Sequence, residues 1–249
     1  MAELLQFPRR QMAQAGKGAA HAANAWNTTV TDVLSAPFKP FQPSNSVDDW
    51  GRDPHLIGAL STLSRIRWDV TVGGQQLLPK EGPALLVANA RYLSLSSLYA
   101  SWALSEATGR TVRFVGRPDV APVGALMRRF GALLTDPDEI ASALRNGQLV
   151  MISAARTRHP RQAGAVDHSL IATAVLTDTP VFPVATMSSP VARSARVEVG
   201  PVERLRRKRR GPLAEVELAQ QLQERLQELL EELGGLHTGV GAIDFFGEG

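Results

Sequence analysis

The sequence predicts an α/β fold in which a mostly parallel sheet is flanked by helices. Short, continuous apolar runs, such as residues 84–88 and 149–152, are typical of strands buried on both faces of a parallel sheet. Segments with helical spacing alternate with these runs along the chain. The composition also fits one ordinary globular domain, because 44% of the 249 residues are hydrophobic, 20% are charged and none is cysteine.

Three parts are expected along the chain: an arm and linker at residues 1–46, a domain at 47–233 and a Gly-rich tail at 234–249. The arm is rich in Ala, Gln and Asn and ends in a Pro-rich stretch, which predicts a flexible or loosely helical segment. The tail is expected to be mobile except where three apolar side chains pack on the domain; they are Ile243, Phe245 and Phe246. The aromatic residues of the arm pack either on the domain or on a lipid surface; they are Phe7, Trp26, Phe38 and Phe41.

The first half of the domain begins with a helix at residues 53–68, where an Asp-Pro pair is a start signal and apolar residues keep helical spacing. Residues 68–74 alternate between polar and apolar side chains, as in a half-buried strand. A continuous apolar run at residues 82–89 predicts a strand that is buried on both faces. A helix rich in small residues follows at residues 95–109 and ends at a glycine.

The second half repeats this alternation. Strands are predicted at residues 111–116 and 148–154, and two helices are predicted between them at 124–131 and 137–147. A helix and two strands then follow, at residues 167–178, 179–186 and 195–202.

A last helix is predicted at about residues 213–233. Four leucines recur in it at spacings of four, three and four, which suits either a short coiled-coil seam or a helix packed on its own domain; they are Leu222, Leu226, Leu229 and Leu233. Two heptads are few for a coiled coil, so we expect the helix to pack on the domain.

The residue types exclude several kinds of chemistry. Without cysteine there is no thiol nucleophile and no Cys-ligated zinc. The histidines lack metal-ligand spacing, so we expect no metal and no other cofactor; they are His21, His55, His159, His168 and His237. The standard hydrolase, zincin, phosphate-loop and dinucleotide motifs are also missing.

The basic residues are almost all arginine, in a chain of formal net charge +3 and pI about 9.7. Arginine suits phosphate, which it grips with two parallel hydrogen bonds, although genome base composition produces the same bias. A dense basic run lies at residues 204–210 and suits a solvated loop, an anionic membrane or nucleic acid. The few aromatic residues argue against nucleic acid. The charged residues of this run, which we expect to contact a membrane, are Arg204, Arg206, Arg207, Lys208, Arg209 and Arg210.

Four blocks of the sequence resemble, in order and spacing, those of the phospholipid/glycerol acyltransferase family, which includes lysophosphatidate-acyltransferase-like proteins. The blocks are "LLPKEGPALLVAN", "GRPDVAPVGALMRRFGALLTDPDEI", "GQLVMISAARTR" and "TPVFPVAT". The resemblance covers about residues 47–233, and "VDDWGRDP" resembles openings of bacterial members. It implies a glycerolipid-acyltransferase-like α/β fold.

In that family the first block runs into Asn-His-x4-Asp, where the histidine is the general base that deprotonates the acceptor hydroxyl. This chain keeps Asn89, but Ala90 stands where the family has histidine and Leu95 where it has aspartate. In the third block Ala155 replaces the family's glutamate. The resemblance therefore implies that the family's mechanism cannot operate here in its usual form.

The third block binds the acceptor's phosphate in the family, and its Thr-Arg end survives in this chain. The resemblance therefore implies that Arg156, Thr157 and Arg158 bind substrate, together with the retained Asn89. Arg91 either points into the pocket mouth or lies on the solvated surface, and we include it among the expected substrate-binding residues. Asp167 and His168 stand where relatives tend to have Phe-Lys-x-Gly; adjacent in sequence, they suit a helix N-cap better than a substitute dyad.

Taken together, these features predict a protein of lipid metabolism that is catalytically degenerate and binds a phospholipid, a lysophospholipid or an acyl donor. One alternative is an active acyltransferase that moves an acyl chain from acyl-CoA or acyl carrier protein to a lysophospholipid with a rearranged base. Another is a basic nucleic-acid-associated protein. No apolar run is long enough to span a bilayer, so we expect a cytoplasmic protein, either free or peripheral at the inner membrane face.

Overall fold

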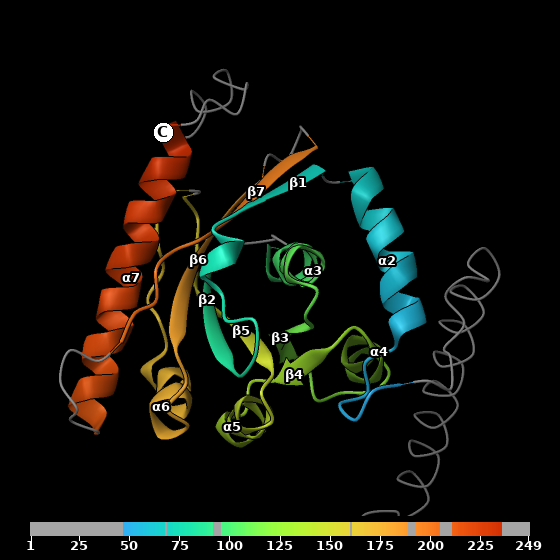
Figure 1. Cartoon of the computed structure of the whole chain (residues 1–249), viewed down its shortest axis with the longest axis horizontal. Coiled ribbons are helices and arrows are strands. Elements are labelled where there is room, and N and C mark those ends of the chain that lie inside the picture. The colour runs from blue at the N-terminus through green and yellow to red at the C-terminus, as the bar shows by residue number, and fades with distance from the viewer. Residues whose placement is uncertain are drawn as a thin grey trace, which may run out of the picture.

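The computed structural model describes residues 47–67, 69–91, 96–159, 161–188, 193–204 and 211–235 of the chain. A single seven-stranded sheet lies between helices, in the order β1-β7-β6-β2-β5-β3-β4 (Figure 1). This α/β architecture confirms the fold class predicted from the sequence. The expected arm at residues 1–46 lies outside the described residues, as does the tail from residue 236 onward.

The bounds of the elements agree closely with the segments predicted from periodicity. The helices are α2 (Pro54–Arg67), α3 (Ser96–Thr108), α4 (Val123–Arg129), α5 (Pro137–Arg145), α6 (His168–Leu176) and α7 (Pro212–Gly235), with a short 3-10 helix η2 (Gln75–Leu77). The strands are β1 (Asp69–Gly73), β2 (Ala84–Arg91), β3 (Val112–Arg117), β4 (Ala132–Leu134), β5 (Leu149–Thr157), β6 (Val181–Ser188) and β7 (Ser194–Val199).

Strands β6, β2, β5, β3 and β4 run parallel to one another, which places their carboxyl ends at one edge of the sheet. Strand β7 is antiparallel to β6, and β1 pairs in parallel with β7. We call the edge where β2, β5 and β6 end the carboxyl edge. In open α/β sheets, ligands bind outside this edge, so it is the first place to look for a functional site.

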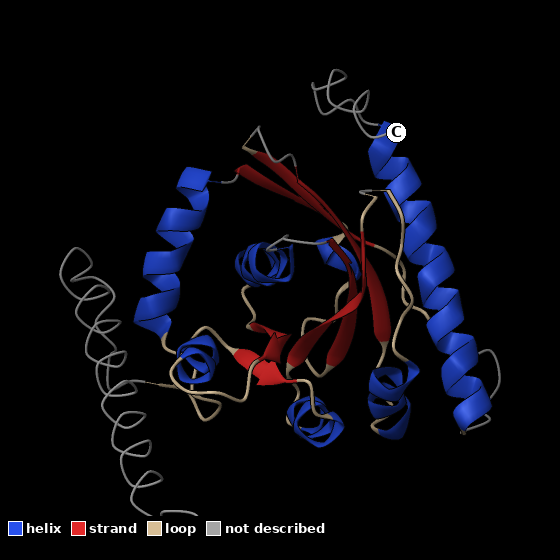
Figure 2. Cartoon of the chain, turned by 180° about the vertical axis from the view of Figure 1, so that it is seen from behind, coloured by secondary structure: helices blue, strands red, loops and turns tan. Residues whose placement is uncertain are grey.

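Two hydrophobic cores lie on the two faces of the sheet. Along β2, Leu85 and Val87 face the core shared with α5, α6 and α7, whereas Leu86 and Ala88 face the core shared with α3. Figure 2 shows α7 and α2 on opposite sides of the molecule, with α3 between them. Because both faces of β2 are covered, its sequence reads as a continuous apolar run.

Helix α7 packs on the sheet through a leucine stripe, as the sequence predicts, but one member of the stripe differs. Leu222, Leu226 and Leu233 are buried in the core, whereas Leu229 is only partly buried. Leu230 is fully buried instead. A helical face that stays against a straight partner drifts away from a strict seven-residue repeat, which explains the shift of one position.

The segment before α2 is anchored by a buried arginine. Arg113 on β3 is only 2% exposed, and its Nη2 donates a hydrogen bond to the Asp48 carboxylate at 2.6 Å. Its Nε donates to Gln148 at 3.0 Å, and its guanidinium lies 5.7 Å from the centre of the Trp50 ring. Burial alone would raise the pKa of Asp48, but hydrogen bonds from Arg52 and Arg113 outweigh it and hold that pKa below its ordinary value.

Candidate functional site

The five residues predicted to bind substrate lie together at the carboxyl edge. They end two neighbouring parallel strands, β2 and β5, whose register pairs Ala90 with Arg156 and Arg91 with Thr157. A shift in register after Ala88 marks a bulge in this pairing. The structure therefore brings the end of β2, with Asn89 and Ala90, next to the end of β5, with Arg156 and Thr157.

Asn89 uses its side chain to join β2 to β6. Its Nδ2 donates a hydrogen bond to the carbonyl of Thr186 at 3.0 Å, and its Oδ1 accepts from the backbone N–H of Thr186 at 2.6 Å. The hydroxyl of Thr186 also donates to Oδ1 at 3.0 Å. The carboxamide thus pairs with Thr186 as a peptide group of a neighbouring strand would, and only 1% of Asn89 is exposed.

Arg91 lies beside the end of β6. Its Nη2 donates to the carbonyl of Ser188 at 2.9 Å, and the Ser188 hydroxyl lies 3.4 Å from the same atom. Tyr99 of α3 is buried nearby. Burial raises the pKa of Tyr99, although hydrogen bonds with Thr186 and Ser188 and the positive charge of Arg91 oppose this change. Arg91 is therefore held by the sheet and is half-buried.

Thr157 closes the turn that follows β5. Its hydroxyl lies 3.4 Å from the carbonyl oxygen of Ala90 and 3.1 Å from those of His159 and Gln162. This single hydroxyl therefore ties the end of β2 to the turn, and it brings the backbone carbonyls of Ala90 and His159 to one place. The turn leads into residues 161–167, where the carbonyl of Ala165 accepts a hydrogen bond from the N–H of Ala155 at 2.8 Å.

Arg156 and Arg158 present exposed guanidinium groups at the end of β5. Neither forms an ion pair with any other residue that the structure describes. Arg161 is exposed three residues further on, so the loop carries several positive charges. Such a loop can bind a phosphate or carboxylate group through charge-assisted hydrogen bonds.

Two of the three positions at which the resembled family has catalytic groups carry methyl side chains. Ala90 is buried at 7% exposure, and Ala155 is exposed. Leu95 lies outside the described residues. Asp167 is the N-cap of α6, as expected, because its Oδ1 accepts hydrogen bonds from the backbone and hydroxyl of Ser169.

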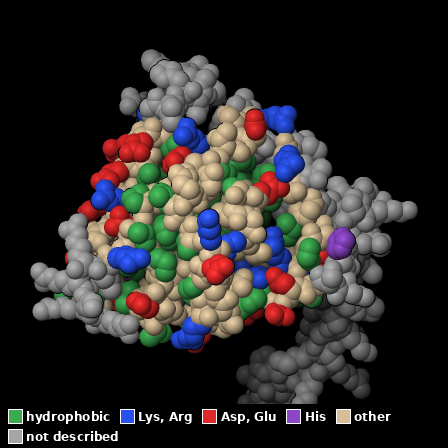
Figure 3. Space-filling view, viewed as in Figure 1, with side chains coloured by type: hydrophobic (Ala, Val, Ile, Leu, Met, Phe, Trp, Pro, Cys, Tyr) green, Lys and Arg blue, Asp and Glu red, His purple; other side chains and the backbone are tan. Residues whose placement is uncertain are grey.

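Arg204 is the one residue of the basic run 204–210 that the structure describes, and it lies at the end of the sheet opposite the carboxyl edge. Arg204 is exposed and follows Glu203, which forms a bridge with Val181 at the amino end of β6. The rest of the run, residues 205–210, lies outside the described residues. Elsewhere, basic, acidic and apolar side chains are interspersed on the face shown in Figure 3.

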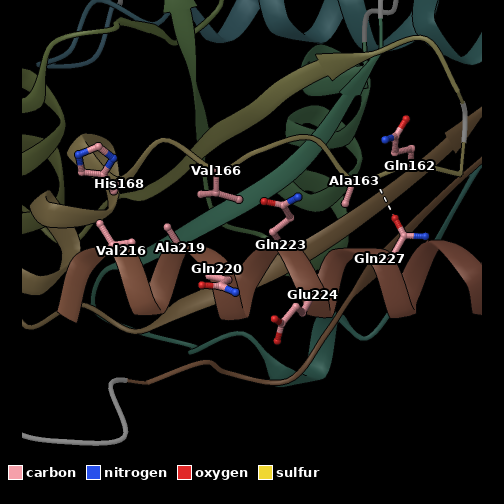
Figure 4. A pocket seen from close by; sticks show the side chains of 10 residues that line it. All are labelled: Gln162, Ala163, Val166, His168, Val216, Ala219, Gln220, Gln223, Glu224 and Gln227. Carbon is pink, nitrogen blue, oxygen red and sulfur yellow. Dashed lines mark hydrogen bonds between the residues drawn. The ribbon is translucent and has the colours of Figure 1, made fainter. Parts of the chain in front are cut away.

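One groove was not predicted from the sequence. It has a volume of about 680 Å³ and lies between α7 and residues 162–168 (Figure 4). Its lining combines apolar groups such as Val166 and Val216 with the amides of Gln220, Gln223 and Gln227. These three glutamines recur along α7 at helical spacing, so the sequence itself contains a pattern that places their amides on one face of the helix.

No helix in the described part of the chain is long and apolar enough to cross a membrane. Among the described residues, no three His, Asp or Glu side chains lie together as metal ligands would.

Comparison with known proteins shows a likeness of fold. Neither protein-family models nor curated protein sequences give a match. The structure is similar to the crystal structure of the 1-acyl-sn-glycerophosphate (LPA) acyltransferase PlsC from Thermotoga maritima, with a TM-score of 0.51 and 17% sequence identity. The likeness covers 72% of this chain and 80% of that one. The chain therefore has an acyltransferase-like fold.

Proposed function

We propose that this chain is a catalytically degenerate acyltransferase-like protein that binds a phospholipid, a lysophospholipid or an acyl donor at its carboxyl edge. The observation that carries the proposal is the pair of exposed guanidinium groups of Arg156 and Arg158, which form no ion pair with a described residue and lie beside a strand end that bears Ala90. The fold likeness to a lysophosphatidate acyltransferase supports the class of ligand.

Acyl transfer to a hydroxyl needs a base within hydrogen-bond reach of the proton that leaves. The methyl groups of Ala90 and Ala155 cannot accept a proton. The loss of a general base lowers a rate by about 10²- to 10⁴-fold, and groups that act as a unit leave little catalysis when they are lost together. The proposal is therefore binding without efficient transfer.

The five predicted residues take different roles in this proposal. Arg156 and Arg158 hold the phosphate, because their guanidinium groups are exposed and form no ion pair within the described part of the chain. Asn89 and Thr157 hold the strands and the turn that present these arginines. Arg91 is bound to Ser188 through one nitrogen and lies at the margin of the site.

The test is equilibrium binding of fluorescent lysophosphatidate to the double variant Arg156→Gln/Arg158→Gln. Each lost hydrogen bond to a charged group is worth about 1.5–3 kcal/mol, so we expect at least tenfold weaker binding. The matched control is Arg128→Gln/Arg145→Gln, which removes two exposed arginines that belong to neither proposed binding surface. Equal affinity of the double variant and the unmodified protein would contradict the proposal.

Two competitors identify the part of the ligand that is recognised. Inorganic phosphate should displace the probe if the arginines bind the headgroup, whereas a monoacylglycerol, which lacks phosphate, should not. Displacement by the monoacylglycerol alone would assign recognition to the acyl chain and remove the arginines from the account.

A second candidate function is an active acyltransferase with a rearranged base. The observation in its favour is that the backbone carbonyls of His159 and Ala90 both accept from the Thr157 hydroxyl, so a histidine stands in the turn beside the position of the missing base. In this case His159→Ala would abolish transfer of labelled acyl groups from acyl-CoA or acyl carrier protein, while His168→Ala, at the start of α6, would not. Transfer that is unaffected by either substitution would exclude His159 as the base.

A further inference from the structure

The groove beside α7 lies outside the site proposed above. One wall is α7, and the other is the segment 162–168, which we call the strap (Figure 4). The strap is tied to α7 at one end, where Gln227 accepts a hydrogen bond from the N–H of Ala163 at 3.0 Å and donates one to the carbonyl of Arg161 at 3.0 Å. At the other end His168 lies near Val216, where both line the groove.

The lining suits an extended peptide better than a hydrocarbon chain. The side chains of Gln220 and Gln223 line the groove from α7 (Figure 4), and a carboxamide can donate to a backbone carbonyl and accept from a backbone N–H. Apolar patches formed by Val166, Val216 and Ala219 can take alternate side chains of such a peptide. Val216 is 45% exposed, so part of this apolar surface is uncovered.

We propose that residues 236–249 of the same chain occupy this groove. The helical rise of about 1.5 Å per residue places Gln227 about 12 Å and Val216 about 28 Å from Gly235, where α7 ends. An extended chain covers about 3.3 Å per residue, so Ile243 can reach about 26 Å and Phe246 about 36 Å back from Gly235. The segment is therefore long enough to span the groove.

The sequence of this segment complements the apolar end of the groove. Ile243, Phe245 and Phe246 are its large apolar residues beyond Val240, and they fall at the distance that reaches Val216. The arm at residues 1–46 is less well placed, because it joins the domain near Asp48, which is bound to β3, three strands along the sheet from β6, where α7 packs. The proposal does not depend on lipid binding.

Disulfide trapping tests this proposal cleanly, because the chain has no cysteine of its own. The full chain with Val216→Cys and Phe245→Cys is oxidised at low protein concentration. We expect an intramolecular cross-link that forms much faster than in the control pair Leu176→Cys/Phe245→Cys. Leu176 is exposed at the end of α6 and does not line the groove.

The other outcomes each contradict the proposal. Equal cross-linking rates for the two pairs would show that the segment does not prefer the groove. A cross-linked dimer would assign the groove to a neighbouring copy. In a second measurement without cysteines, Phe245→Ser/Phe246→Ser should speed hydrogen exchange of the strap amides, and Thr238→Ser should not. Unchanged exchange in the double variant would also overturn the proposal.

Discussion

Asn89 shows how a residue singled out by a sequence resemblance can serve the fold. Its carboxamide satisfies both the N–H and the C=O of Thr186, so it extends the pairing of β2 with β6 beyond Val184. From the sequence we predicted a substrate-binding role, because the residue begins a motif block. The hydrogen bonds with Thr186 became visible only when strands 97 residues apart were placed side by side.

Asn89→Ala should therefore destabilise the protein markedly. The substitution leaves the buried N–H and C=O of Thr186 without a partner, at a cost of about 1–3 kcal/mol for each group. Urea unfolding measures the loss. The control is Asn146→Ala, because the exposed Asn146 amide donates to the carbonyl of Ser142 at 2.8 Å and its loss should cost less than about 0.5 kcal/mol. Equal losses for the two variants would contradict a structural role for Asn89.

Asp48 should make the free energy of unfolding depend on pH. Its pKa is lowered in the folded state, so its contribution is complete above the unfolded pKa and disappears as the pH falls through the folded value. Asp48→Asn should unfold at lower urea concentration than the unmodified protein at pH 7. The difference should stay constant down to about pH 5 and shrink below about pH 4. A difference that does not change with pH would contradict this role.

At the scale of elements, the spacing of apolar residues predicts those helices and strands that are long or strongly patterned. Each predicted helix and strand is present, and the bounds differ by a few residues at most. Strand β4 was not predicted, because Ala132–Leu134 is only three residues long and shows no period. In α7 the pattern identified the helix, but Leu229 and Leu230 are both leucine, so only the packed structure separates them.

This distinction within α7 gives a matched pair of variants. Leu230→Ala removes a fully buried side chain and should cost about 2–5 kcal/mol in the free energy of unfolding. Leu229→Ala removes a partly buried side chain of the same size from the next position and should cost clearly less. Urea unfolding of both variants decides the register. A larger loss for Leu229→Ala would show that α7 packs as the sequence pattern suggested.

At the scale of the whole molecule, the arginines of the carboxyl edge and Arg204, the one described residue of the basic run, lie at opposite ends of the strands. Arg156 and Arg158 follow β5 at the carboxyl edge, whereas Arg204 lies at the amino end of β6. The sequence predicted both features but could not show this separation, because it depends on the reversal of the chain in β7. Membrane contact through residues 204–210 and ligand binding at the carboxyl edge are therefore separate proposals.

The separation predicts that the two proposed functions can be changed independently. Neutralising Arg206, Arg207, Arg209 and Arg210 should abolish sedimentation with anionic liposomes, since each basic residue near such a surface contributes about 1 kcal/mol. The same variant should bind soluble, short-chain lysophosphatidate as the unmodified protein does. Sedimentation that persists would remove the basic run from the membrane proposal.

The central claim is that the carboxyl edge binds its ligand and lacks the groups that transfer an acyl chain. Its most direct test is transfer of labelled acyl groups to lysophosphatidate by the unmodified protein and by the variant Ala90→His/Leu95→Asp/Ala155→Glu. Because residue 90 pairs with Arg156, the guanidinium should keep an introduced imidazole neutral and able to accept a proton. We predict transfer by the restored variant alone. Robust turnover by the unmodified protein would contradict the account.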